Sequence, residues 1–408
     1  MPQPRPKPLE GVRVIELGQV YQGPYCGYLL AQAGAQVIKV EPLGGEPVRQ
    51  RAAVTPTAAI PFALLNGDKR AMTLNLKSEE GKEILRRLVA GADVLIENYA
   101  PGVLDRLGVG YVALREVNPR LIYASGSGYG LSGPDRDRQA MDITIQAVSG
   151  MMSVTGFPDS GPVKCGPAVV DFLSGAHIFG AIMLALFERT RSGEGQLVEV
   201  SMQETVYPTL ASNLSMVYEH ASPPPRVGNR HGGLAACPYN VYPCADGHLA
   251  IICTNEAHWR NLVEAIGDPR LSEDPRFATR DGRVACMDEV DGLIAEWSSA
   301  LPRDAAMALL RTTKVPSAPV RDLIEVTNDP HMHGRGALHW QDHPEYGRVV
   351  VPGSPLRMHA HERSAPTPSR RLGEDGRAIL AELGFAPEDI DRLERDGVTV
   401  APAPQAAE

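Results

Sequence analysis

Short hydrophobic runs alternate with segments of helical character through the N-terminal half of the chain. The run Val12–Leu17 is bounded by Gly11 and Gly18, and runs of this kind are typical of buried strands. A helix is predicted where Ser78 precedes Glu79, because serine caps helices and acidic residues favour the first turn. The predicted strands are residues 12–17, 37–40, 71–76, 93–97, 121–124 and 196–201.

This alternation indicates an α/β fold class, with a large doubly wound, Rossmann-like domain whose parallel sheet carries helices on both faces. The pattern changes at Ser222-Pro223-Pro224-Pro225, which predicts a stiff, extended linker. The strands and helices beyond it predict a smaller α+β domain. The predicted division is 1–221 plus 335–408 for the large domain, 228–326 for the small domain, and 222–227 and 327–334 for the linkers.

Composition narrows the function without naming a ligand. The net charge of −9 repels a nucleic-acid backbone, so nucleic acid is not an expected partner. No uncharged apolar stretch reaches the roughly 18 residues of a membrane-spanning helix. The longest, Ala176–Phe187, predicts a buried core helix and no membrane association. No apolar run follows the basic residues near the N-terminus, so we expect a cytoplasmic protein without a signal peptide.

Residues that commonly bind metals or form disulfides show no pattern. The six cysteines are scattered, with no C-x-x-C pair, and the 11 histidines show no metal-ligand spacing. Neither a metal site nor a disulfide framework is predicted.

Basic and amide side chains follow several predicted strands. Lys77 follows the strand at 71–76, Asn98 and Arg106 follow the strand at 93–97, and Arg138 ends a polar loop. Ligands of doubly wound sheets bind outside the carboxyl ends of the strands. Taken singly these residues are typical solvated surface groups, but together they suit a ligand with several phosphate groups.

Asp171 is the sharpest single candidate for catalysis. It follows Ala168-Val169-Val170 and precedes the predicted core helix. A helix N-terminus would hold its carboxylate as an anion, and apolar neighbours would limit its solvation, which suits a nucleophile. The spacing alone favours a simpler role as a helix N-cap. Asp142 is expected to be a loop or cap residue.

Taken together, the segments resemble a known family. Ordered matches run nearly end to end, at residues 8–17, 34–42, 66–70, 93–108, 149–156, 228–231 and 371–374. On these motifs the chain resembles the class III coenzyme A transferases, the group that includes formyl-CoA:oxalate and carnitine CoA transferases. Each motif is weak alone, and their number and order carry the resemblance.

The resemblance implies that Asp171, within Val170-Asp171-Phe172-Leu173-Ser174-Gly175, is a covalent nucleophile and not an N-cap. It implies a coenzyme A thioester as substrate, with no cofactor and no metal. The implied partners are an acyl-CoA donor, a carboxylic acid acceptor and a second copy of the chain in an interlocked homodimer. The implied CoA contacts are Val20, Tyr21, Gln22, Leu74, Asn75, Lys77, Asn98, Tyr99, Arg106 and Arg138.

The implied reaction transfers CoA from an acyl-CoA thioester to a carboxylic acid through an aspartyl anhydride and an aspartyl-CoA thioester. We expect main-chain N–H groups of His231-Gly232-Gly233 to stabilise the oxyanion. The chain also departs from the family. Gln19 and Tyr21 stand where formyl-CoA transferases have His and Gln, and Pro42 stands where they have Arg. These departures weigh against oxalate as the acceptor.

Racemases of 2-methylacyl-CoA thioesters belong to the same superfamily and are the alternative function. They use a His immediately before an Asp, in a segment that aligns with Met141-Asp142. Methionine has no titratable group and cannot exchange a proton at the α-carbon of a thioester. Met141 therefore favours the transferase.

Overall fold

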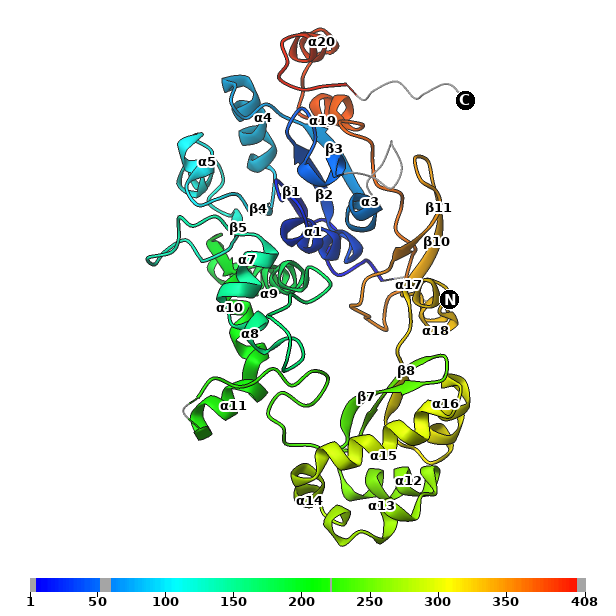
Figure 1. The fold of residues 1–408 in the computed structure, drawn as a ribbon. Helices are drawn as coiled ribbons and strands as arrows, with labels where there is room; N and C mark the ends of the chain where they lie inside the picture. Colours follow the sequence, from blue (N-terminus) through cyan, green and yellow to red (C-terminus); the bar gives the residue numbers. More distant parts are fainter. Residues whose placement is uncertain (1–4, 52–59, 221, 402–408) are drawn as a thin grey trace. The chain divides into compact units, whose positions relative to one another are not determined.

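The computed structural model of the chain describes residues 5–51, 60–220 and 222–401. The chain divides into two compact units (Figure 1). The outermost residues of the predicted large domain, 1–4, 221 and 402–408, lie outside the described ranges. The first unit contains Met1–Ile145, Gly166–Val206 and Thr327–Glu408, and the second contains Gln146–Cys165 and Tyr207–Val326.

A six-stranded parallel sheet forms the centre of the first unit. Its strands are Arg13–Glu16 (β1), Gln36–Glu41 (β2), Lys69–Thr73 (β3), Val94–Glu97 (β4), Ile122–Ser127 (β5) and Leu197–Ser201 (β6). They lie in the order β3-β2-β1-β4-β5-β6, the doubly wound order, and the six predicted strands are confirmed. The third strand ends at Thr73 and not Leu76, because the chain turns and the Asn75 N–H donates to the Val398 carbonyl.

Helices cover both faces of this sheet. Ile15 and Leu95 share one hydrophobic core with α4, α6, α19 and α20, whereas Val14 and Ile96 share the other with α1 and α9. Ser78 caps α4 as predicted, because its Oγ accepts the Gly81 N–H. The helices are Gln22–Gln32 (α1), Pro47–Gln50 (α2), Ile60–Asn66 (α3), Glu79–Ala90 (α4), Val103–Arg106 (α5), Tyr111–Val117 (α6), Asp142–Val148 (α7), Val169–Ser192 (α9), Met202–Val206 (α10), Pro330–Gly334 (α18), Gly376–Glu382 (α19) and Pro387–Arg395 (α20).

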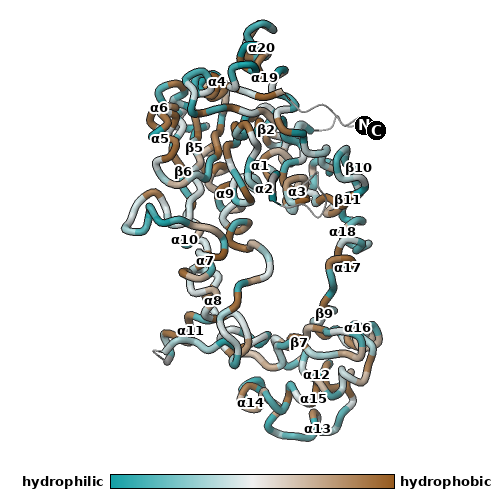
Figure 2. The backbone as a smooth tube through the Cα atoms, turned by 45° about the horizontal axis from the view of Figure 1, so that its top comes forward, coloured by the Kyte–Doolittle hydropathy of each residue, from teal (hydrophilic) through white to brown (hydrophobic). Residues whose placement is uncertain are grey.

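The C-terminal segment completes the first unit. α19 lies beside β3 (Figure 1), and Arg70 of β3 pairs with Glu382 of α19 at 2.8 Å. Buried Ile379 and Leu393 join the same core as β1. Figure 2 shows mainly hydrophilic residues along α20, whose apolar side chains lie on one face only. An antiparallel hairpin precedes these helices, with strands Leu338–His343 (β10) and Gly347–Pro352 (β11).

The predicted core helix at 176–187 is part of α9, which has 24 residues and is apolar over most of its length (Figure 2). By length and composition alone α9 could cross a membrane, which corrects the expectation that no segment is long enough. It packs as a core helix on one side, where Ile178 and Ile182 contact the sheet core. On its other side Leu184 and Phe187 are 73% and 63% exposed, so the helix is buried on one face only.

The second unit has a three-stranded antiparallel sheet and its own hydrophobic core. Tyr242, Leu249, Trp259, Leu262 and Ile294 lie in that core. The strands, in the order β7-β8-β9, are Tyr239–Cys244 (β7), Gly247–Ile252 (β8) and Ser317–Pro319 (β9). The helices are Met151–Val154 (α8), Tyr207–Leu210 (η1), Ala211–His220 (α11), Glu256–Ile266 (α12), Pro269–Glu273 (α13), Pro275–Phe277 (η2), Arg280–Ala285 (α14), Met287–Ser299 (α15), Arg303–Thr312 (α16) and Leu323–Thr327 (α17), the last reaching into the first unit.

The second unit also takes in two segments that the sequence analysis assigns to the large domain, 146–165 and 207–221. The Gly228 N–H donates to the Gly156 carbonyl at 2.9 Å, and Arg226 donates to the Ser160 carbonyl. These bonds join the first segment to the chain that leads into β7. The domain boundaries given above stay a prediction.

Candidate active site

Two predicted CoA-binding segments meet where β1 and β4 end. The chain leaves these neighbouring strands in opposite directions, so their carboxyl ends form the topological switch point of the sheet. Asn98 holds Gln19 at both main-chain groups, with Oδ1 accepting the Gln19 N–H at 2.8 Å and Nδ2 donating to the Gln19 carbonyl at 2.9 Å. Gln19 Nε2 also donates to Tyr99 Oη at 3.0 Å. The two segments, 79 positions apart in sequence, therefore form one surface.

A cavity of about 430 Å³ opens beside this surface. Four of the predicted CoA contacts line it together: Leu74, Asn75, Lys77 and Tyr99. The rest of its wall is mostly apolar. It comes from the end of β2, from the segments that follow β1, β2 and β3, and from the residue after α5. Its residues are Leu17, Val40, Glu41, Pro42, Leu43, Leu76 and Leu107. Apolar walls with a few polar groups at the edge are typical of a cofactor-sized ligand site.

Arg106 lies at the end of α5, next to the cavity residue Leu107. Its side chain is exposed, and within the described ranges no ion pair involves it. Lys77 is also exposed at the cavity edge. Two cations at the mouth of an apolar cavity suit an anionic group such as a phosphate.

Asp171 is the third residue of α9, and Ala168 occupies the N-cap position. The N-cap interpretation of Asp171 is therefore wrong. The cap is Asp142, whose Oδ1 accepts the Val170 N–H at 2.9 Å and the Asp171 N–H at 3.4 Å. Asp142 thus has the cap role expected for it, and it leaves the Asp171 carboxylate available for other contacts.

The environment of Asp171 raises the pKa of its carboxyl group to about 7. Burial is the main cause, the charge of Asp142 adds to it, and the charge of Arg51 acts in the opposite direction. Burial therefore outweighs any stabilisation of the anion by the helix N-terminus, where Asp142 accepts two of the N–H groups. A poorly solvated carboxylate that is partly ionised at neutral pH suits a nucleophile.

The turn after β1 connects the cavity to Asp171. Tyr21 stacks on Phe172, the residue after Asp171, with ring centroids 5.7 Å apart. Tyr25 of α1 meets the same ring edge-on at 4.9 Å. Gln19, two residues before Tyr21, contacts the cavity residue Tyr99. A ligand that fills the cavity and follows this turn would therefore reach Asp171.

Known proteins with similar sequences identify the family. CoA-transferase family III matches residues 9–376. The chain belongs to this family. The succinate–glutarate CoA-transferase of Agrobacterium fabrum is 37% identical over 402 residues, which cover 96% of this chain and 98% of the relative. The formyl-CoA:oxalate CoA-transferase of Streptomyces avermitilis is 35% identical over 410 residues, which cover 96% of this chain and 99% of that relative.

The fold comparison agrees with the sequence comparison. A solved structure of a CAIB/BAIF family protein from Brucella suis matches with a TM-score of 0.83 and 35% identity, covering 93% of this chain and 100% of that one. The predicted resemblance is thus confirmed, and the protein is a class III CoA-transferase.

The structure brings most of the predicted family contacts to the switch point, but not all. The Gln22 side chain is 2% exposed, lies against Gly126 of β5, and has no hydrogen-bond partner for Nε2 among the described residues. Arg138 lies in the exposed loop after β5, pairs with Asp135 at 3.1 Å and does not line the cavity. Direct contacts with CoA stay predictions for these two side chains and for the other predicted residues alike.

Other residues of the site were not among the predicted contacts. Phe172 and Arg51 lie close to the nucleophile, and Glu46 bonds to the Val20 N–H at 2.8 Å. The sequence around these three residues does not predict their contacts, because Phe172, Arg51 and Glu46 contact residues that are remote in sequence. His231, Gly232 and Gly233 belong to the second unit, and their role at the oxyanion stays a prediction.

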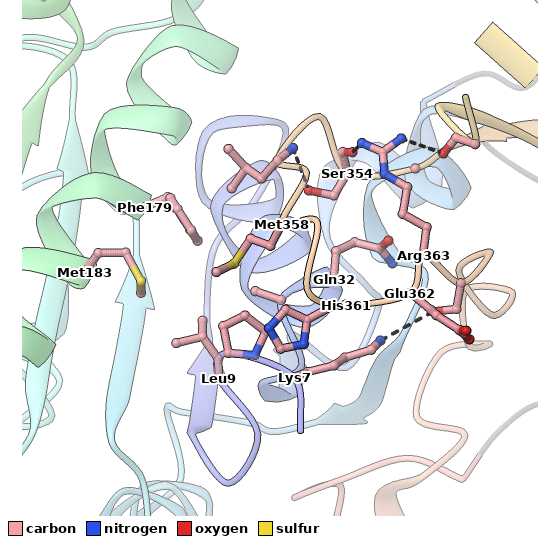
Figure 3. A pocket seen from close by; sticks show the side chains of 16 residues that line it. Lys7, Leu9, Gln32, Phe179, Met183, Ser354, Met358, His361, Glu362 and Arg363 are labelled. Carbon is pink, nitrogen blue, oxygen red and sulfur yellow. Dashed lines mark hydrogen bonds between the residues drawn. The ribbon is translucent and has the colours of Figure 1, made fainter. Parts of the chain in front are cut away.

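A second cavity, of about 310 Å³, lies elsewhere in the first unit (Figure 3). Phe179 and Met183 of α9 face Leu9, Met358 and His361 across it (Figure 3). None of the predicted CoA contacts lines this cavity. Within the described part of the chain, no group of three or more His, Cys, Asp or Glu side chains is arranged to hold a metal.

Proposed function

We propose that this class III CoA-transferase moves CoA from an acyl-CoA donor to a carboxylic acid through covalent intermediates on Asp171. An Asp171 Oδ attacks the thioester carbonyl carbon, the C–S bond breaks, and CoA leaves as the thiolate. The product is a mixed anhydride. The thiolate then attacks Cγ of Asp171 and expels the donor acid as a carboxylate, which leaves an aspartyl-CoA thioester.

The second half of the proposed reaction runs in reverse with the acceptor. The acceptor carboxylate attacks Cγ of Asp171 and releases the thiolate, forming a second anhydride. The thiolate attacks the acceptor carbonyl of that anhydride, which yields the new acyl-CoA and regenerates the Asp171 carboxylate. Atoms and charge balance without a metal or a redox group. The reaction consumes the donor CoA thioester and the acceptor acid, and it releases the donor acid and the new acyl-CoA.

The observation that carries this proposal is the position of Asp171. It is a half-buried carboxyl group with a pKa of about 7, next to a stacked pair that leads along one turn to a ligand-sized cavity. Within the described residues it has no ion pair that would occupy its oxygens. An ordinary structural aspartate would be exposed or paired with a cation.

We propose that CoA lies in the cavity at the switch point. The apolar walls, including Leu74 and Leu107, suit the adenine and pantetheine parts. Lys77 and Arg106 at the edge suit the phosphate groups. Gln19, Asn98 and Tyr99 form a rigid floor along which the thioester end extends toward Asp171.

For the acceptor we propose a dicarboxylic acid. The names of both relatives include dicarboxylic acids, oxalate in one and succinate with glutarate in the other. Arg51 supplies a cation for the second carboxylate, since its guanidinium lies 6.0 Å from the centroid of the Tyr21 ring and its charge acts on Asp171. Pro42 in the cavity and Gln19 beside it still weigh against oxalate, and succinate or glutarate fits better.

We also propose that two copies of the chain form the interlocked homodimer that the family resemblance implies. Exposed apolar side chains on α9, such as Leu184 and Phe187, support a partner on that face. The second copy would remove them from water. Sedimentation of the purified protein gives the mass of the assembly and tests this point.

Trapping of the acyl intermediates tests the central proposal. The protein is mixed with succinyl-CoA and quenched with hydroxylamine, which converts an activated aspartyl group into a hydroxamate. We expect the modified residue to be Asp171 by mass spectrometry of its peptide, and no modification without the thioester. A hydroxamate on Asp142, or none at all, would overturn the assignment.

The racemase alternative has its own test. In deuterated water with a 2-methylacyl-CoA and no acceptor acid, we expect no label at C2. Met141 is 52% exposed and has no group that transfers a proton. Label at C2 would favour the racemase instead.

A further inference from the structure

Val20, in the turn between β1 and α1, has a backbone conformation that valine rarely adopts. Its φ is +64°, in the left-handed region. The other described non-glycine residues with positive φ are Asp68, Leu234 and Lys314, none of which is β-branched. A β-branched residue there costs about 1–3 kcal/mol and persists only where surrounding contacts hold it. Contacts around the turn must therefore hold Val20 in this conformation.

Three side chains, two of them buried and that of Asn98 half-buried, hold consecutive main-chain groups of this turn. Lys39 Nζ donates to the Gly18 carbonyl at 2.9 Å, Asn98 bonds both main-chain groups of Gln19, and Glu46 Oε2 accepts the Val20 N–H at 2.8 Å. The bond to Glu46 is the one made by the strained residue itself. Because its acceptor is a carboxylate, this bond is stronger than one between neutral groups.

Glu46 is itself fixed in place. It is 1% exposed, and its Oε1 lies 3.2 Å from Lys39 Nζ. We call Glu16, Lys39, Glu46 and Lys69 the charge cluster, since Glu16 also pairs with Lys39 at 3.0 Å and with Lys69 at 2.7 Å. Burial alone would lower the pKa of Lys39, but the charges of Glu16 and Glu46 hold it above its ordinary value. Burial lowers the pKa of Lys69 to about 8, so its pairing with Glu16 only partly offsets the cost of burying that ammonium group.

The turn that Glu46 holds leads directly to the nucleophile. Tyr21, the residue after Val20, stacks on Phe172, which follows Asp171. Glu46 does not line the cavity, so it has no direct contact there with a bound ligand. Any effect of Glu46 on the reaction would therefore pass through the turn, directly at Val20 or by way of Lys39, which donates to the Gly18 carbonyl.

We propose that Glu46 is a positioning residue, which holds the strained turn so that the thioester carbonyl is aligned with Asp171. This inference rests on the proposed function. Most binding energy for CoA comes from the cavity and its edge, which Glu46 does not touch. Loss of the Glu46 bond should therefore misalign the reacting atoms while leaving CoA bound, and a misplacement of about 1 Å can cost about 100-fold in rate.

A double-mutant cycle tests this role. We expect Glu46→Gln to lower kcat by about tenfold or more and to change KM for the CoA thioester by less than about threefold. Glycine adopts positive φ without strain, so in a Val20→Gly background the same substitution should lower kcat by about threefold or less. Equal losses in the two backgrounds would show a general structural effect and overturn the proposal. So would an unchanged kcat, or a change in KM alone.

A second variant covers the case in which Glu46→Gln does not fold. Glu46→Asp keeps the charge beside Lys39 but is one methylene too short to reach the Val20 N–H, and the same loss of kcat and the same dependence on Val20→Gly are expected. Asp93→Asn is the matched control. It weakens the 2.7 Å ion pair with Arg189 at the opposite end of β4, so it should lower stability without changing kcat or KM at a temperature where it is folded.

The hydroxamate experiment separates the two proposals. If the unmutated protein is trapped at Asp171 and the cycle shows no coupling, only the role of Glu46 is wrong. If trapping labels another residue, the proposed function is wrong whatever the cycle shows.

Discussion

The charge cluster and the neighbouring carboxylates Asp171 and Asp142 are two acidic regions of the same unit, with opposite surroundings. In the cluster each carboxylate lies within 3.2 Å of a lysine ammonium group. At the nucleophile, Asp171 lies near a second carboxylate, that of Asp142, and is without an ion pair among the described residues. In the cluster the charges of Glu16 and Glu46 hold the pKa of Lys39 above its ordinary value, although burial lowers the pKa of Lys69 to about 8. At Asp171, burial and the charge of Asp142 both raise the pKa of the carboxyl group and disfavour its anion.

This difference separates a structural role from a chemical one. Compensated charges deep in a protein fix geometry, because removing either partner leaves an isolated ion in a low-dielectric environment. An uncompensated carboxylate is held in an unfavourable state, which makes it more reactive toward an electrophilic carbon. The turn of residues 18–22 contacts the charge cluster through Gly18 and Val20 and contacts Phe172 through Tyr21. The charge cluster can therefore orient the turn relative to Asp171.

The largest effect is expected from Asp171→Asn. We expect kcat for CoA transfer to fall by about 10³-fold or more, since a neutral amide does not form the anhydride. The measurement is the steady-state rate with succinyl-CoA and glutarate. Turnover near the unmutated rate would mean that another group is the nucleophile.

Stability of the same variant serves as its control. Because folding raises the pKa of Asp171 to about 7, its contribution to stability is present below its ordinary pKa and is lost as pH rises toward 7. Asp171→Asn should therefore unfold at an equal or higher urea concentration than the unmutated protein at pH 8. A strongly destabilised variant would leave the loss of activity open to a structural explanation.

The second largest effect is expected in the charge cluster. Glu16→Gln leaves Lys39 and Lys69 with one anion fewer, so it should lower the free energy of unfolding by about 3–5 kcal/mol. Urea denaturation measures this change. The control is Glu83→Gln, which weakens exposed pairs with Arg86 and Arg87 and should cost less than about 1 kcal/mol. Equal losses would contradict the idea that burial sets the difference.

Arg106→Ala is expected to act on binding. KM for the CoA thioester should rise about tenfold with little change in kcat, because a phosphate contact stabilises the ground and transition states equally. Arg115→Ala on α6 is the control, since that exposed arginine pairs with Glu194 away from the cavity. A fall in kcat at constant KM would argue against a phosphate contact at Arg106.

The smallest effect is a shift in the pH profile. The rate of CoA transfer should rise with pH through an apparent pKa of about 7, as Asp171 loses its proton. Asp142→Asn keeps a cap for α9 but removes the neighbouring charge, so it should lower that apparent pKa by less than about one unit. An unchanged profile would mean that Asp142 does not act on the nucleophile.

Much of the fold could be predicted from local pattern. The six strands of the parallel sheet follow from short apolar runs, and the Ser78 cap follows from a serine in front of acidic residues. These features depend on neighbours within a few positions, which a sequence displays directly. The family motifs likewise marked Asp171 and the segments around Leu74 and Asn98.

The tertiary structure decided how these parts act on one another. Gln19 and Asn98 are 79 positions apart, and Glu46 reaches the Val20 N–H across 26 positions. The pKa of Asp171 is raised mainly by burial, and the charge of Asp142, 29 positions upstream, adds to the shift. Burial, ion pairing and backbone strain are set by distances in space between residues remote in sequence. A linear pattern therefore predicts the elements, and only their packing determines which carboxylates are compensated and which one remains reactive.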